Sequence, residues 1–312
     1  MRIAAMRVKV AGVALSTVFV CLGLGNLRAE AAVITIPQSA LVPSTQYYTD
    51  IIGGGIGPVV VMTGGGNAAN VGLASGRNDD GFSGPIPLGF TLSFFGNSYT
   101  TFFANNNGNI SFGAGIAEFT PTGPQGASQP VISPFFADVD TRAALSGVMH
   151  LRTDIPNEII VTWDQVGYFD AHDDKLDSFQ LVLRGPGFVV PPGEGAIGFF
   201  WKGMQWETGD ASGGSGGFGG TPGAVGFGDG GSNGEVLQGS IQNGIAAVVQ
   251  NHQIWFDPNL QPIQPICGVP GTPPCSTSVP EPSSMALLVI GIAGLAATLK
   301  WRTRLGVGLP SR

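Results

Sequence analysis

The chain has 312 residues, which allows one large domain or two small ones, and it contains 50 glycines, 23 prolines and 19 phenylalanines. Charged residues make up only 11% of the chain and the formal net charge is −7. This glycine content argues against a helical bundle, because glycine costs about 1 kcal/mol in a helix interior. The negative charge argues against a nucleic-acid partner, because phosphate binding needs clustered lysine and arginine. A hydrophobic fraction of 43% still supplies a sizeable core.

The N-terminus has the pattern of a secretory signal peptide, which we place at residues 1–31. Arg2, Arg7 and Lys9 precede an uncharged apolar run over residues 10–25, and Ala29-Glu30-Ala31 supplies a small-x-small cleavage site. A retained membrane anchor is the alternative.

Residues 32–76 are rich in glycine, alanine and threonine, and we expect strands and loops that belong to the main domain or pack on it. From residue 77 to residue 251, apolar and polar residues alternate in several runs, each bounded by Gly, Pro, Asn or Asp, which is typical of strands. The clearest runs are those of Leu88, Phe90, Leu92 and Phe94, of Ile159, Val161 and Trp163, of Phe179, Leu181 and Leu183, and of Ile197, Phe199 and Trp201. The mature chain shows no long helical period. We therefore predict an all-β fold, either an antiparallel β-sandwich or an irregular barrel, with one face of each sheet buried.

Residues 252–278 are predicted to form a proline-rich linker, because proline at this density favours an extended spacer. Cys267 and Cys275 lie on either side of a glycine- and proline-containing loop. Outside the cell they would most simply pair with each other, which makes them disulfide candidates.

Residues 279–304 combine the tripeptide Pro280-Glu281-Pro282, an apolar stretch over residues 285–299 and a basic cluster, before a tail at residues 305–312. A helix of about 15 residues is a short membrane span. The arrangement resembles the PEP-CTERM sorting signal of Gram-negative bacteria. The resemblance implies a transient inner-membrane anchor, processing by an exosortase-type enzyme, and delivery to the cell surface or extracellular matrix. A plain single-pass anchor is the alternative.

Several short strings imitate enzyme signatures. Residues 213–217 fit the G-x-S-x-G pattern around Ser215, but that motif needs a strand-to-helix elbow, and no helical pattern follows. A serine hydrolase would also need a nearby histidine, and the chain contains only His150, His172 and His252. A G-x-G-x-x-G match in the same run lacks the βαβ unit that gives it meaning. We predict that the protein is not an enzyme and requires no cofactor.

Three acidic pairs, Asp79-Asp80, Asp138-x-Asp140 and Asp173-Asp174, lie near predicted strand ends. Calcium takes six to eight oxygen ligands, often from such clusters. If a structural calcium binds, Asp138 and Asp140 are the best candidates for its ligands. The alternative is that these residues serve only turn formation, since Asp and Asn bond to their own backbone in loops.

The run Asn105-Asn106-Asn107-Gly108-Asn109 lies between two apolar stretches and predicts a hairpin with a type I′ turn. Trp163, Trp201, Trp206 and Trp255 could form a platform for stacking sugars. We favour a place in the core, because Trp163 and Trp201 lie on predicted inward faces.

Taken in order, five segments resemble the nidogen-like (NIDO) domain over roughly residues 77–250. They are residues 105–112, 130–142, 162–169, 174–183 and 205–214. The resemblance implies an extracellular, non-enzymatic domain associated with cell–matrix adhesion.

These features predict an exported, non-catalytic protein of the cell surface or extracellular matrix that binds extracellular polysaccharide or a matrix protein, for example in a biofilm. Two other hypotheses stay open. One is a carbohydrate-binding or carbohydrate-cleaving exoprotein, and the other is a structural protein that assembles with itself through exposed edge strands.

Overall fold

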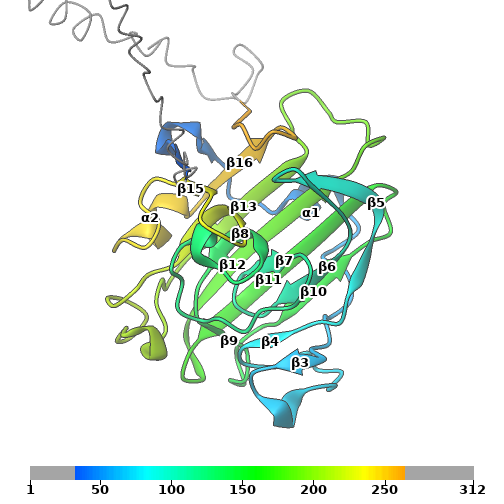
Figure 1. The fold of residues 1–312 in the computed structure, drawn as a ribbon. Helices are drawn as coiled ribbons and strands as arrows, with labels where there is room; N and C mark the ends of the chain where they lie inside the picture. The colour runs from blue at the N-terminus through cyan, green and yellow to red at the C-terminus, as the bar shows by residue number, and fades with distance from the viewer. Residues whose placement is uncertain (1–31, 264–312) are drawn as a thin grey trace, which may run out of the picture.

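The computed structural model describes residues 32–263, and these fold into two β-sheets packed face to face, with the long strands of one sheet behind the shorter strands of the other (Figure 1). The two sheets do not close into one barrel. The all-β sandwich is therefore confirmed. The predicted signal peptide, Cys267, Cys275, the Pro280-Glu281-Pro282 motif and the apolar stretch 285–299 lie outside the described residues.

The first sheet has nine strands. In spatial order they are β1 (Val33–Ile36), β15 (Gly234–Leu237), β14 (Ala224–Asp229), β8 (Pro130–Phe136), β7 (Asn109–Ser111), β6 (Asn97–Asn105), β4 (Gly81–Phe82) and β3 (Gly64–Gly65), with β5 (Ile86–Phe94) also paired to β6. One pairing is parallel, that of β1 with β15.

The second sheet has seven strands. In spatial order they are β10 (Met149–Arg152), β11 (Glu158–Tyr168), β12 (His172–Arg184), β13 (Ile197–Gly203), β16 (His252–Phe256) and β2 (Val42–Pro43), with β9 (Val139–Asp140) paired to β11. All its pairings are antiparallel.

The predicted alternation sets which side chains enter the core between the sheets. In β5, Leu88, Leu92 and Phe94 are buried while Gly89 and Thr91 are exposed. The inward residues of β11, β12 and β13 join the same core cluster. Successive side chains of a strand point to opposite faces, so a period of two delivers one apolar row to the interior.

The expectation that each sheet buries only one face is wrong for the second sheet. Ile160, Val182 and Phe200 alternate with the core residues, yet they are buried in a second cluster on the outer face. Tyr48, the first residue of the short helix α1 (Tyr48–Ile52), packs in this cluster. The segment from β2 into α1 therefore covers this face, and the central strands have apolar residues on both sides.

The other α-helix, α2 (Ile245–Val249), is also only five residues long. Among residues 32–263, no helix is long and apolar enough to cross a membrane.

The two ends of the described chain belong to the sandwich. The segment before residue 77 contributes β1, β2 and β3 to the sheets. His252–Phe256, expected at the start of the proline-rich linker, instead forms β16 between β13 and β2. The alternation of buried Ile254 and Phe256 into the core marks it as a strand, and the proline-rich composition begins only after it.

Candidate functional site

Three loops meet at one end of the sandwich, beside β3, β4 and β9 at the bottom of Figure 1. They are residues 78–80 before β4, residues 106–108 between β6 and β7, and residues 137–138 between β8 and β9. Asp79 and Asp140 form an isolated antiparallel bridge, which fixes the first loop beside the third.

The predicted hairpin at residues 105–109 is confirmed, because Asn105 pairs with Asn109 across antiparallel β6 and β7. Its turn differs from the predicted type I′ turn. The loop has three residues, and of these only Gly108 has a positive φ, of 75°. A Cβ atom at Gly108 would lie 1.7 Å from the Phe135 carbonyl oxygen, so the turn needs glycine for space as well as for conformation.

The asparagine side chains of this hairpin are buried and bind the neighbouring loops. Asn107 donates from Nδ2 to Asp80 Oδ1 at 2.7 Å and accepts at Oδ1 from the Val139 amide at 3.0 Å. Asn106 donates to the Val139 carbonyl. The asparagine run therefore holds the first and third loops together, a role beyond turn formation.

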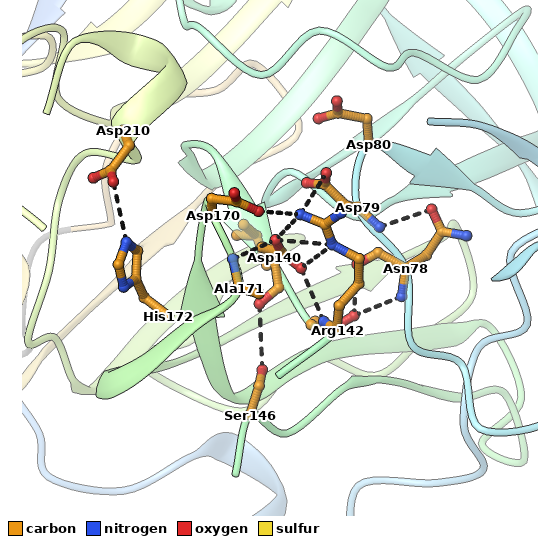
Figure 2. Close-up of polar contacts among 12 residues, drawn as sticks. Asn78, Asp79, Asp80, Asp140, Arg142, Ser146, Asp170, Ala171, His172 and Asp210 are labelled. Atoms are coloured by element: carbon orange, nitrogen blue, oxygen red, sulfur yellow. Dashed lines mark hydrogen bonds and ion pairs between the residues drawn. The ribbon is translucent and has the colours of Figure 1, made fainter. Parts of the chain in front are cut away.

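Asp140 is buried and its carboxylate is fully occupied by partners from the chain (Figure 2). The Arg142 guanidinium contacts both carboxylate oxygens, and the backbone amides of Arg142 and Ala171 donate to them at 2.9 and 2.7 Å. The same guanidinium pairs with Asp79 Oδ2 at 3.1 Å and Asp170 Oδ1 at 3.0 Å. Asp140 thus orders this corner through Arg142, and both of its carboxylate oxygens accept from donors of the chain.

Asp138 lies two residues away in a different environment. Its side chain is 1% exposed, and neither carboxylate oxygen has a hydrogen-bond partner within the described chain. One oxygen each from Asp138, Asp79 and Asp80 can be chosen so that all three lie within 4.8 Å of one another. We call these three residues the acidic cluster. The Oδ1 atom of Asp79 is also buried and without a partner.

Burial and mutual repulsion raise the pKa values of the acidic cluster. The pKa of Asp138 rises to about 8, first because burial penalises the charged form and then because Asp80 and Asp79 are near. The pKa of Asp79 rises to about 7 for the same first cause, with Asp140 and Asp80 adding to it. Burial also raises the pKa of Asp80, opposed by the hydrogen bond from Asn107. Three carboxylates held this close attract a proton or a cation.

The sequence shows both acidic pairs, and the structure brings Asp138 together with Asp79 and Asp80. In an unbroken strand, residues two apart point to the same face, so alternation alone would place Asp138 beside Asp140. The chain bends at residues 137–138, between β8 and β9, and this gives the two side chains different surroundings. That Asp79 and Asp80 would meet Asp138 follows from strand pairing across about 60 residues, which local pattern does not reveal. The third pair lies elsewhere: Asp173 accepts from the Leu145 amide, and Asp174 from Tyr168 and Lys175.

Ser215 and the three histidines, which a serine hydrolase would need to bring together, each have other hydrogen-bond partners. Ser215 forms a tight backbone turn with Phe218. The ring of His172 contacts Asp210 Oδ2 at 3.1 Å, whereas those of His150 and His252 bond to the backbone oxygens of Gly57 and Gln250. None of these contacts joins a histidine to a serine.

The four tryptophans of the described chain are core residues, as predicted. Trp163, Trp201 and Trp206 are fully buried and Trp255 is 6% exposed. Trp201 of the second sheet donates from its indole to the Pro134 carbonyl of the first at 2.9 Å, so it links the two layers. These side chains present no surface for stacking a sugar.

Comparisons with known proteins match the central part of the chain and its C-terminal motif. The family described as NIDO related matches residues 61–256, and the PEP-CTERM protein-sorting motif matches residues 278–304. Alpha-tectorin is similar at 30% identity over 165 residues in Mus musculus and in Homo sapiens, and at 28% over 163 residues in Gallus gallus. Each alignment covers 44% of this chain but only 7% of the relative's length.

No solved structure matches the chain. The sorting motif and the matched family support an exported, cell-surface protein, and the motif implies processing by an exosortase. Because the family match spans 196 of the 312 residues, the chain belongs to the NIDO-related family.

Proposed function

We propose that this protein is a non-catalytic adhesion protein of the cell surface or extracellular matrix of a Gram-negative bacterium, and that it binds extracellular polysaccharide or a matrix protein. One observation carries the proposal: a NIDO-related domain and a PEP-CTERM motif occur in the same chain. The first supplies a binding module, and the second supplies the route out of the cell. This step to adhesion is an argument by family analogy.

The charge and the buried tryptophans of the described chain limit what it can bind. The described residues carry 19 acidic and six basic side chains, a net charge of −13. An acidic surface of this density repels acidic polymers unless cations bridge them. The buried tryptophans also weigh against a carbohydrate-binding or carbohydrate-cleaving exoprotein built on exposed aromatic residues.

A deletion strain tests the proposal directly. We expect it to lose surface attachment or biofilm cohesion, and expression of the intact protein to restore both. A complementing variant with Glu281→Ala in the sorting motif should fail to restore them if delivery to the surface is needed. Normal attachment and cohesion in the deletion strain would contradict the adhesion role.

One observation favours self-assembly as a second candidate. In the described chain β1 is the outermost strand of the first sheet, and its Val33 and Ile34 are about half exposed. Apolar side chains on an edge strand favour pairing with another chain. Light scattering of the purified protein checks this candidate, because a monodisperse monomer, with and without calcium, would contradict it.

A further inference from the structure

We propose that the acidic cluster of Asp79, Asp80 and Asp138 is a calcium-binding site, which clamps the loops at this end of the sandwich. The proposal does not depend on the adhesion role. Its ligand set differs from the pair that the sequence favoured, since Asp140 is replaced by Asp79 and Asp80.

The carboxylate of Asp138 is buried and has no partner within the described chain. A buried charge without a partner is strongly destabilising, so buried carboxylates in proteins are paired, hydrogen-bonded or bound to a metal. Asp138 has neither an ion pair nor a hydrogen bond to its side chain within residues 32–263. Its oxygens face Asp79 and Asp80, which add negative charge where compensation is needed.

The Arg142 guanidinium, which pairs with Asp79, does not supply that compensation. Arg142 directs its donors to Asp140, Asp170 and Asp79 Oδ2. Asp79 thereby keeps one oxygen, Oδ1, that is buried and without a partner, beside those of Asp138. Arg142 therefore positions Asp79 but leaves the space between the three carboxylates without positive charge.

The donor set selects the kind of cation. All ligand atoms of the cluster are carboxylate oxygens, and no histidine or cysteine takes part. Hard oxygen ligands suit calcium and magnesium rather than zinc or copper. Calcium fits better, because carboxylates that bind through one or both oxygens suit its flexible coordination of six to eight oxygens.

The surrounding backbone leaves room for the carboxylates. Gly209 lies against Asp138, and a Cβ atom there would be 2.4 Å from Asp138 Oδ2. The φ of Gly209 is −81°, so the backbone itself does not require glycine and the close approach to the carboxylate does. Asn107 in turn fixes Asp80 by a hydrogen bond to its Oδ1 atom, which leaves the other oxygen of Asp80 for a ligand.

Calorimetric titration with calcium chloride tests the site in the exported protein, purified and stripped of metal with EDTA. We expect one calcium per chain, with a Kd of about 10⁻⁴–10⁻³ M as in extracellular modules. At about 100 times the Kd, calcium should raise Tm by roughly 5–10 °C. Absence of both binding and a Tm shift would overturn the proposal, and an equal effect of magnesium would overturn the assignment to calcium.

Asp138→Asn keeps the side-chain shape and removes the charge. We therefore expect at least a tenfold loss of calcium affinity, and calcium should no longer raise the Tm of this variant. Asp80→Asn, at a more exposed position, should weaken binding in the same direction and guards against a folding defect in the first variant. Asp174→Asn is the matched control, because this exposed acid lies outside the cluster. Unchanged affinity in both cluster variants would overturn the proposal, because calcium would then bind outside the cluster.

Discussion

Two of the regions that bury carboxylates treat their charge differently. On the outer face of the second sheet, Arg184 donates to Glu158 at 2.7 Å and to Glu194 at 2.5 Å, and its guanidinium lies 4.3 Å from the Trp255 ring centroid. In the acidic cluster, Asp138 is equally buried but has no such cation. The fold thus completes one charged site from its own residues and leaves the other to a proton or an ion.

The largest expected effect is a pH dependence that separates the two regions. The pKa of Asp138 is raised from 3.8 to about 8 in the folded protein. The folded state then holds a proton that the unfolded state has released, so without calcium stability falls as pH rises through this window. At about 1.4 kcal/mol per pH unit, the loss reaches about 5 kcal/mol for Asp138 alone.

Urea unfolding of EDTA-treated protein between pH 4 and pH 8 measures this loss as the difference between the wild type and Asp138→Asn. Asp80, Asp79, Asp140 and Asp210 raise the pKa of Asp138 after burial does, so the difference reports Asp138 together with its repulsion by these neighbours. Arg142 is present in both proteins. Calcium should flatten the wild-type curve. If the free energy of unfolding changed with pH in the same way in the two proteins, the charge of Asp138 would already be compensated. The difference between the acidic cluster and the Arg184 site would then disappear.

The second test removes the Arg184 cation from the site on the outer face of the second sheet. Arg184→Met leaves Glu158 buried without its partner, and we expect a loss of about 3–5 kcal/mol in the free energy of unfolding. The double variant Arg184→Met, Glu158→Leu is the control, since removal of both charges should recover part of the loss. A loss below about 1 kcal/mol for the single variant, measured by urea unfolding, would mean that the pair contributes little.

The third test uses two aspartates on one loop. Asp140→Asn weakens charged hydrogen bonds from Arg142 and should cost about 2–3 kcal/mol. Asp138→Asn removes no such bond, so in EDTA at pH 8 it should not lower stability. Thermal unfolding of both variants side by side checks the contrast, and an equal loss in both would contradict it.

The smallest effect is expected at the surface. Asp174 pairs with Lys175, but its side chain is 58% exposed, and such pairs are screened by water and salt. Asp174→Asn should therefore change the free energy of unfolding by less than about 0.5 kcal/mol. A larger change in urea unfolding would show that its bond with the Tyr168 hydroxyl matters more than the ion pair.

The sequence predicts most of what local pattern controls. Alternation in β5, β11, β12 and β13 identifies the strands and their inward residues, because the period of a strand is fixed by its backbone. The asparagine hairpin is also predicted, since Gly108 at a tight turn is a local signal.

What the sequence leaves out depends on contacts between distant segments. The burial of Ile160 and Val182 on the outer face follows from the path of the chain through α1, more than 100 residues earlier. The parallel pairing of β1 with β15 joins residues 201 apart, and no turn signal marks it. The acidic cluster has the same origin, because three loops assemble it.

The pairing of β1 with β15 also brings the two limits of the described chain close together. Ile34 lies opposite Glu235 in this pair, and Gln261, near the other limit of the described chain, contacts the Glu235 carboxylate at 3.5 Å. Both limits therefore lie at one corner, at the end opposite β3, β4 and β9 in Figure 1. A protein tethered at that corner would point its aspartate-lined tip outward, toward the surrounding medium and its ions.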